Sequence, residues 1–402
     1  MRVLVMTTPD PSHLPPLAPV AWALRAAGHD VLVAGQPDSA ESARTTGLSM
    51  VVFGEPFDTE QLVLNSLAPG KRPLESRPGS APGTAPPVKG GFGGVWIERA
   101  RAMAGEYLAF ARDYRPDLVL CDPLDYSGLV IGGVLGIPVV HHRWGVDPVG
   151  TPRIPAAREE LAGFCRTLGL ETLPDPAVVL DPCPAALQLP GIRPGTPVRY
   201  VPFNGSGAMP DWVRAEWGAP RTTTTRRVVV SLGRRTLAYH GVPFVRALLH
   251  ALAGVPDVEL IATAGAEHRA AVGPVPAQVR MLDPFPLHAV LGSCDAIVTH
   301  GGSATTMTAT LHGVPQLALP QMADCFAHGE RLAACGAGIS LATVAEQDDP
   351  AVLRASLSLL LDDPSYAAGA SRLRADMERM PSPAEVVPEL ERLAGKASSA
   401  SF

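Results

Sequence analysis

Short runs of β-branched and other apolar residues alternate along this chain with segments of helical apolar spacing. That alternation is typical of α/β folds with buried parallel strands. The first half of the chain contains four such runs, at residues 2–6, 31–34, 118–121 and 138–141. A helical segment over 19–27 separates the first two runs and is followed by Gly28, a residue suited to the positive φ that often ends a helix. Strand, helix and strand within about 35 residues predict a βαβ unit with a right-handed crossover.

The second half repeats the pattern, with runs at residues 227–231, 258–263, 296–299 and 316–319. Between the two clusters lies a stretch rich in Gly, Pro and Thr over 204–226, which we interpret as an interdomain linker. A chain of 402 residues has room for two domains of about 100–200 residues each. We therefore predict two doubly wound α/β domains. The expected boundaries are a first domain over 1–205, a linker over 206–226, a second domain over 227–380, and a C-terminal helix and tail over 381–402 that packs back toward the first domain.

Composition excludes several classes of protein. The formal net charge is −6, which gives no basic footprint for a nucleic-acid partner. No apolar run approaches the roughly 20 residues of a membrane span, and no signal peptide is recognisable, so we expect a cytoplasmic protein with no membrane contact. The six Cys residues are scattered without a CxxC pair, which argues against a disulfide framework and a structural zinc site.

Residues 65–94 break the α/β pattern. They are too rich in Pro and Gly for a helix and too numerous for an ordinary connection. Two interpretations stay open for the loop at about 60–95: a disordered insertion, or a mobile loop that closes over a variable substrate.

The segment that begins at Ala296 combines a strand, a Gly-rich turn and the start of a helix. The strand ends at His300, and Gly301 and Gly302 precede a helix that opens with Ser303, Ala304 and Thr305. Amide groups at a helix N-terminus, together with the helix dipole, favour an anion. Neither GxGxxG nor a P-loop is present, so the pattern predicts a phosphate site of another type. The alternative is an ordinary capped helix behind a buried strand.

Three segments then point to a known family: HGGSATTMTATLHGVPQLALPQMADCFAHGERL, TTPDPSHLPPLAPVAWALRAAGHDVLVAG and RYVPFNGSGAMPDWV. They resemble GT-B glycosyltransferases of family one, in the actinobacterial branch that glycosylates polyketides and other secondary metabolites. The resemblance extends from about residue 1 to 395 and fails mainly at 60–95. It implies two Rossmann-like domains that face each other across a cleft, the first for the acceptor and the second for a nucleotide-sugar.

The resemblance assigns the second-half residues to the donor. Its diphosphate set is Gly233, Arg234, His300, Gly301, Gly302, Ser303, Ala304 and Thr305. The family usually has Gly at the position of Ala304. The methyl group of Ala304 leaves less room for a phosphate to approach the backbone. The family also has an Asp-Gln pair for the sugar hydroxyls, where this chain has Asp324 and Cys325. A thiol in place of a carboxamide favours a deoxygenated hexose.

Two further loops complete the donor side. Leu282 and Phe285 match the loop that packs on the nucleobase, although a hydrophobic turn explains Phe285 equally well. Gly233 follows a buried strand and allows close approach, and Arg234 could neutralise the diphosphate. We expect Arg235 to be exposed and unengaged.

The first half supplies the expected catalytic pair. His13 follows the first strand, at the carboxyl ends of the parallel strands, and an imidazole suits deprotonation of a hydroxyl near neutral pH. It matches the family's general base, and Asp122 matches the acid that accepts from its ring; Asp10 and Asp125 are weaker candidates. His142 and Trp144 follow another strand and are expected to contact the acceptor.

The sequence thus predicts an inverting, metal-independent hexosyltransferase with no resident cofactor. The expected donor is a dTDP-deoxysugar, and the expected acceptor is a hydroxyl of a hydrophobic natural product such as a polyketide or enediyne. The alternatives are an epimerase or hydrolase of a nucleotide-sugar, or a non-catalytic nucleotide-sugar-binding activator, on the same fold. A homodimer and an auxiliary activator protein stay open.

Overall fold

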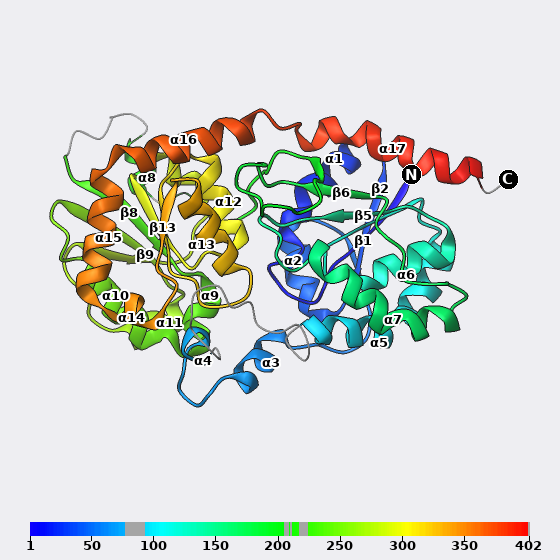
Figure 1. The fold of residues 1–402 in the computed structure, drawn as a ribbon, viewed down its shortest axis with the longest axis horizontal. Helices are drawn as coiled ribbons and strands as arrows, with labels where there is room; N and C mark the ends of the chain where they lie inside the picture. The colour runs from blue at the N-terminus through cyan, green and yellow to red at the C-terminus, as the bar shows by residue number, and fades with distance from the viewer. Residues whose placement is uncertain (77–92, 205–208, 210, 217–223, 401–402) are drawn as a thin grey trace. The chain divides into compact units, whose positions relative to one another are not determined.

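The computed structural model describes residues 1–76, 93–204, 209, 211–216 and 224–400, which form two compact units (Figure 1). The first unit contains the described residues within Met1–Thr59, Pro86–Phe203 and Arg379–Phe402. The second contains those within Glu60–Ala85 and Asn204–Glu378. In this part of the chain no helix is long and apolar enough to cross a bilayer.

The first unit is built on a seven-stranded sheet in the order β3-β2-β1-β4-β5-β6-β7, in which neighbouring strands pair in parallel. Its strands are β1 (Arg2–Met6), β2 (Asp30–Gly35), β3 (Met50–Val52), β4 (Leu118–Cys121), β5 (Val139–His142), β6 (Val178–Asp181) and β7 (Thr196–Pro197). The predicted runs become β1, β2, β4 and β5. The order of strands reverses between β1 and β4, which makes their carboxyl ends a topological switch point.

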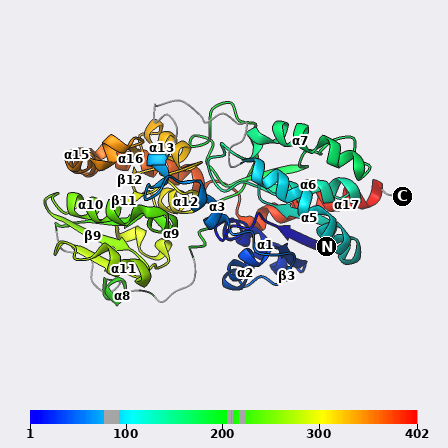
Figure 2. The ribbon, with the colours of Figure 1, turned by 90° about the horizontal axis from the view of Figure 1, so that it is seen from below.

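Helices cover both faces of this sheet because its strands are apolar on both sides. One face packs against α5 (Gly93–Tyr114), α6 (Tyr126–Leu135) and α7 (Ile154–Thr167), which lie together in Figure 2. The other packs against α1 (Ala18–Ala26) and the C-terminal helix α17 (Pro383–Ala400). Val386, Val387 and Leu390 of α17 are buried in the core of the first unit. Helix α2 (Ala40–Thr46) connects β2 with β3.

The second unit has a six-stranded parallel sheet in the order β10-β9-β8-β11-β12-β13. Its strands are β8 (Arg226–Ser231), β9 (Val258–Thr263), β10 (Val279–Leu282), β11 (Ala296–Thr299), β12 (Gln316–Ala318) and β13 (Gly338–Ser340). The four predicted runs are β8, β9, β11 and β12. The switch point of this sheet lies between β8 and β11. The fold class is therefore as predicted, with two Rossmann-like parallel sheets.

One face of this sheet packs against α10 (Val242–Leu252) and α15 (Pro350–Asp362). The remaining helices are α9 (Gly233–Thr236), α11 (Ala266–Val272), α12 (Ser303–Leu311), α13 (Cys325–Ala334), α14 (Val344–Asp348) and α16 (Pro364–Glu378). Part of the predicted linker forms a further helix, α8 (Asp211–Glu216). Val213 is buried in the core of the second unit, and Trp212 lies under the guanidinium of Arg227 at 4.5 Å. These residues are therefore not a free linker.

The predicted insertion also differs from expectation. Helices α3 (Thr59–Ser66) and α4 (Pro73–Ser76) lie within it, and residues 60–76 pack with the second unit although the prediction placed them in the first domain. Arg72 is buried there, with its guanidinium 4.2 Å from the Phe244 ring and 2.7 Å from Asp348 Oδ1. The rest of the predicted loop, 77–92, lies outside the described residues.

Candidate functional site

The loop after β1 carries His13. Backbone hydrogen bonds run from the His13 amide to the Asp10 carbonyl at 3.0 Å and from the Asp10 amide to the Thr8 carbonyl at 2.7 Å. The Asp10 carboxylate accepts from the Ser12 amide at 2.9 Å and from its hydroxyl at 2.6 Å. Asp10 therefore stabilises the turn that presents His13, which is a structural role.

Asp122 lies next to this loop because of the strand register. Met6 of β1 is opposite Cys121 of β4, so the residues that follow the two strands share one edge of the sheet. The Thr8 hydroxyl is 2.5 Å from His13 Nδ1 and donates to Asp122 Oδ2 at 2.8 Å. The predicted pair is thus brought together, with a Thr8 contact to both members that the sequence reasoning missed.

The environment of Asp122 is closed to solvent. Burial is the largest influence and raises the pKa of its carboxyl, and Asp125 acts in the same direction; the nearby His13 and the amides of Thr8 and Leu124 lower it. Asp125 caps helix α6 and binds Arg99 at 3.1 Å. Arg99 is buried and also binds Gln36 Oε1 at 2.7 Å and the Tyr107 hydroxyl at 3.0 Å. It supplies one buried positive charge beside two buried carboxylates, and it too was missed.

The two predicted acceptor residues differ in exposure. Trp144 is partly exposed and stacks on the His13 ring, with centroids 4.0 Å apart and planes 30° apart. His142 is 3% exposed, and its Nδ1 lies 2.6 Å from the Arg143 carbonyl oxygen. Burial lowers the pKa of His142 to about 4. His142 therefore has little surface to offer an acceptor, whereas Trp144 is partly exposed beside His13. Trp96, whose ring centroid is 6.2 Å from that of His13, is itself buried.

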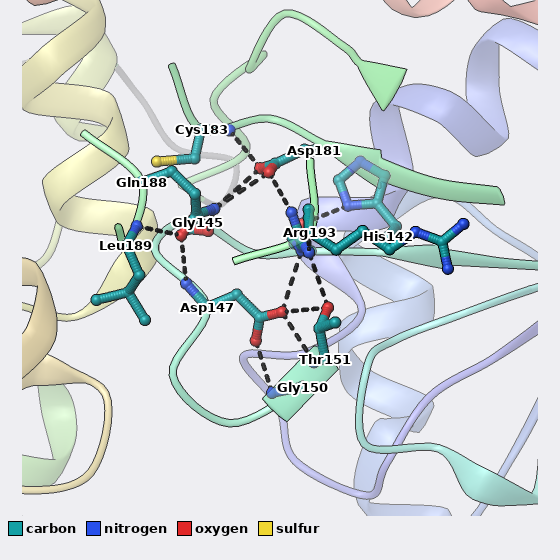
Figure 3. Close-up of polar contacts among 11 residues, drawn as sticks. His142, Gly145, Asp147, Gly150, Thr151, Asp181, Cys183, Gln188, Leu189 and Arg193 are labelled. Atoms are coloured by element: carbon teal, nitrogen blue, oxygen red, sulfur yellow. Dashed lines mark hydrogen bonds and ion pairs between the residues drawn. The ribbon is translucent and has the colours of Figure 1, made fainter. Parts of the chain in front are cut away.

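Trp144 directly follows Arg143 in the chain, and the polar partners of Arg143 are labelled in Figure 3. The Arg143 guanidinium is buried and binds Asp147 at 3.0 Å and Asp181 at 2.5 Å. It also donates to the Thr151 hydroxyl at 2.8 Å and to the Arg193 carbonyl at 2.9 Å. The loop after β5 is therefore anchored to the end of β6 by charge-assisted hydrogen bonds.

The second unit contains the predicted phosphate residues. Thr299 of β11 is opposite Ser231 of β8, so the loops that carry His300 and Gly233 leave the sheet at the same edge. A methyl carbon at residue 233 would lie 2.8 Å from His300 Cε1, and one at residue 302 would lie 2.2 Å from His300 Nε2. A methyl carbon at residue 301 would lie 2.6 Å from the Cys325 carbonyl oxygen. A side chain at residue 233 or 302 would therefore require the His300 ring to move, and one at residue 301 would require the Cys325 backbone to move.

Helix α12 begins beside this ring. Gly302 occupies its N-cap position and brings no side chain to cap the first turn, which Ser303, Ala304 and Thr305 form. The first-turn amides of a helix have no partner within the helix and attract anions. In the part of the chain that the structure describes, the buried Thr306 hydroxyl and His300 Nδ1 have no hydrogen-bond partner. This end of α12 therefore offers polar groups suited to phosphate oxygens.

His300 is a neutral donor at pH 7 rather than a cation. Burial lowers the pKa of its ring to about 4, against the opposing effects of Asp324 and of a hydrogen bond with the Ser231 backbone. A neutral His300 ring can donate one hydrogen bond to a diphosphate oxygen, but it brings no positive charge.

The two neighbouring arginines differ in exposure and in their surroundings. Arg234 is exposed and forms an ion pair with Glu60 at 3.1 Å. Arg235, expected to be unengaged, is partly buried and close enough to lower the pKa of both His300 and Cys325. It is the arginine that lies beside the predicted phosphate residues.

The predicted sugar and base residues follow the next loops. Asp324 precedes helix α13 and is partly exposed, while Cys325 is buried and its pKa is raised by that burial. The backbone of Cys325 lies close to Gly301, where a methyl carbon would come within 2.6 Å of the Cys325 carbonyl oxygen. Phe285 is 9% exposed and packs in the core with Val213, so little of it is accessible, whereas Leu282 at the end of β10 is only partly buried.

Metal ligands do not cluster in this site. Among residues 1–76, 93–204, 209, 211–216 and 224–400, no three His, Cys, Asp or Glu side chains are grouped so that they could hold a metal ion.

Both halves of the chain match a known family. Residues 92–233 match the family described as erythromycin biosynthesis protein CIII-like, N-terminal domain, and residues 246–393 match its C-terminal domain. TDP-daunosamine transferase DnrS of Streptomyces peucetius is 35% identical over 98% of this chain and 97% of its own length. The 10-deoxymethynolide desosaminyltransferase of Streptomyces venezuelae is 34% identical over 98% of both chains.

Solved structures agree with this relationship. Spinosyn rhamnosyltransferase SpnG, in a complex with thymidine diphosphate, superposes with a TM-score of 0.83 and 36% identity. The match covers 97% of this chain and 100% of that one. The similarity therefore includes both units and the loops that carry the candidate residues.

Proposed function

The chain belongs to the erythromycin biosynthesis protein CIII-like family of GT-B glycosyltransferases, and from that premise we propose that it moves a deoxyhexose from a dTDP-sugar to a hydroxyl of a polyketide-type aglycone. Sugar transfer to a natural product is common to its relatives. The deoxysugar, the dTDP carrier and the oxygen nucleophile are proposals for this chain. They are supported by the thymidine diphosphate bound to SpnG and by relatives named for daunosamine and desosamine transfer.

The proposed reaction is a single displacement. His13 Nε2 takes the proton of the acceptor hydroxyl as its oxygen bonds to the anomeric carbon, and the bond from that carbon to the diphosphate breaks with its electron pair. Attack on the face opposite the leaving group inverts the anomeric configuration. The Asp122 carboxylate stabilises the imidazolium that forms, as an aspartate does in a hydrolase triad.

On the donor side, we propose that the diphosphate binds the start of α12. The residues are His300, Gly301, Gly302, Ser303, Ala304 and Thr305, with Gly233 and an arginine of the adjacent loop, Arg234 or Arg235. Amide dipoles, a neutral His300 and one guanidinium provide hydrogen bonds and charge for the leaving group without a metal. Asp324 accepts from sugar hydroxyls, Leu282 and the exposed part of Phe285 contact the base, and Trp144 contacts the acceptor.

The observation that carries the proposal is the hydrogen-bonded approach of His13 to the buried Asp122 at the switch point of the first sheet. A protein that only binds a nucleotide-sugar has no use for a base in this position. His13→Ala should therefore lower kcat by about 10² to 10⁴ while the affinity for dTDP stays close to that of the wild type. His250, exposed on α10, provides the matched control as His250→Ala.

The experiment is a calorimetric titration with dTDP and with UDP in EDTA, followed by transfer assays with dTDP-deoxysugars and a set of polyketide aglycones. Tighter binding of dTDP than UDP and an inverted glycoside, identified by mass and by NMR of the anomeric proton, would support the proposal. Release of free sugar or of an epimer would indicate the alternative activities on this fold. Activity that EDTA abolishes would contradict the metal-free mechanism.

Two further features of the proposal concern the protein in the cell. We propose a cytoplasmic enzyme that acts as a monomer or homodimer, and the assays should be run with and without an added activator protein. Full transfer by the purified chain alone would remove the activator from the proposal.

A further inference from the structure

The Thr8 hydroxyl lies between the base and the acid of the proposed catalytic pair. Thr8 is fully buried, and its Oγ1 is 2.5 Å from His13 Nδ1 and 2.8 Å from Asp122 Oδ2. A hydroxyl has one proton to donate and lone pairs to accept with. The hydroxyl can therefore donate to only one of these two groups.

Backbone amides determine which contact is the donated one. The Thr8 amide donates to Asp122 Oδ2 at 2.6 Å, and the Leu124 amide donates to Asp122 Oδ1 at 2.8 Å. An amide can only donate, so both carboxylate oxygens act as acceptors. An ionised carboxylate accepts from the Thr8 hydroxyl as well, and the hydroxyl then has only a lone pair for His13 Nδ1. The ring must donate that hydrogen bond from Nδ1.

We propose that Thr8 is a positioning residue that holds the His13 proton on Nδ1 and so leaves the Nε2 lone pair as the proton acceptor. The inference rests on the proposed function, because it concerns the base of that reaction. When Nε2 takes the acceptor proton, the positive ring keeps its Nδ1 bond to Thr8, and Thr8 keeps its bond to the Asp122 carboxylate. The charge is thus stabilised through an intervening hydroxyl.

Two other contacts of His13 complete the arrangement. The stacked Trp144 indole restricts rotation of the imidazole out of its plane, and the bond from the His13 amide to Asp10 fixes the backbone. Neither contact distinguishes the two ring nitrogens. The contact with Thr8, in contrast, is made to Nδ1 alone and therefore selects a tautomer.

The first experiment reads the tautomer without any substrate. In the full chain with ¹⁵N-labelled histidine, NMR distinguishes a protonated from an unprotonated Nδ1, and His13→Gln assigns the signal. We expect Nδ1–H in the wild type and in Thr8→Ser, which keeps the hydroxyl. We expect a mixture of tautomers in Thr8→Val, which has nearly the same shape without it. A proton on Nε2 in the wild type, or an unchanged signal in Thr8→Val, would overturn the inference.

The second experiment measures turnover of the same variants. Thr8→Val should lower kcat about 10-fold or more with little change in the KM for the donor, and Thr8→Ser should recover most of that loss. Asp122→Ala is the second route if Thr8→Val does not fold. Without a carboxylate to accept its proton, the Thr8 hydroxyl can donate to His13 Nδ1, and the His13 proton should move toward Nε2. If the wild type transfers no sugar, the proposed function fails, but the NMR result still decides the role of Thr8.

Discussion

The His13 imidazole lies against the indole of Trp144, with ring centroids 4.0 Å apart and 30° between the planes. The two residues come from different strand ends, His13 from the loop after β1 and Trp144 from the loop after β5. The orientation of the proposed base thus depends on a loop that is distant in the sequence.

Replacement of Trp144 should therefore affect turnover. An aromatic pair contributes about 0.5–1.5 kcal/mol beyond its buried area, which corresponds to roughly 2- to 10-fold in a rate if the stacking is needed in the reactive complex. We expect Trp144→Leu to lower kcat by that amount and Trp144→Phe to retain more activity. Steady-state kinetics with saturating donor provide the measurement, and equal kcat for Leu, Phe and wild type would show that the stacking does not orient His13.

The Arg143 network in Figure 3 should contribute to stability more than to chemistry. Removal of a buried cation leaves Asp147 and Asp181 without their countercharge, which typically costs about 3–5 kcal/mol. Arg143→Met should lower the free energy of unfolding by about that much in urea denaturation. Arg158, which pairs with Asp175 near the surface, is the control, and Arg158→Met should cost less than about 1 kcal/mol. Equal losses of unfolding free energy in the two variants would mean that burial of the Arg143 ion pairs does not increase their contribution to stability.

Much of the fold was predictable because buried parallel strands have a simple signature. The eight apolar runs correspond to eight strands of the two sheets, and the C-terminal helix follows from its apolar spacing. The strands that were missed are of two kinds. β3, β7 and β13 are only two or three residues long, and β6 and β10 contain polar or proline-flanked sequence. Short edge strands are formed by pairing with a neighbour, which the local sequence does not encode.

The candidate site was only partly predictable, for a related reason. His13, Asp122 and His300 stand at strand ends beside recognisable motifs. Thr8 and Arg235 do not belong to such a motif. What identifies them is the side chains that lie next to the Thr8 hydroxyl and the Arg235 guanidinium in the folded protein, and the sequence does not show those neighbours. Arg234 and Arg235 are adjacent in the sequence, and only their burial distinguishes them.

These two arginines provide a direct comparison of donor binding. Arg235 lies beside His300, whereas Arg234 is exposed and paired with Glu60. We expect Arg235→Gln to weaken dTDP binding by about 10-fold or more, because a charge-assisted bond to phosphate is lost. Arg234→Gln should have a smaller effect. Calorimetry on both variants measures the difference, and the opposite order would return the diphosphate role to Arg234.

Buried histidines should make the protein less stable in mild acid. Burial lowers the pKa of His141, His142 and His300 to about 4. Between about pH 6.5 and 4 the unfolded chain binds protons at these rings that the native protein does not. The free energy of unfolding should therefore fall as the pH is lowered through this window, by up to about 1.4 kcal/mol per pH unit for each ring.

His141 allows this to be tested at a side chain that the proposed reaction does not use. Its ring is buried, and Nε2 has no hydrogen-bond partner among the described residues. His141→Gln removes one titrating group, so urea unfolding at about pH 7 and pH 5 should show a smaller difference in stability than the wild type does. Parallel losses in both proteins would mean that His141 is not one of the groups responsible.

The glycines around His300 give the sharpest test of the donor half. A methyl carbon at residue 302 would lie 2.2 Å from His300 Nε2, so Gly302→Ala must displace the ring from the start of α12. We expect dTDP affinity to fall at least 10-fold, because both the ring donor and the approach to the helix amides are lost.

Gly105→Ala is the matched control: this glycine lies on α5, and an added methyl would contact nothing within 4 Å. The control should bind dTDP normally and gain about 0.5–1 kcal/mol in stability, since Ala is favoured over Gly within a helix. Normal dTDP binding by Gly302→Ala, with the protein folded as judged by circular dichroism, would place the diphosphate away from this helix.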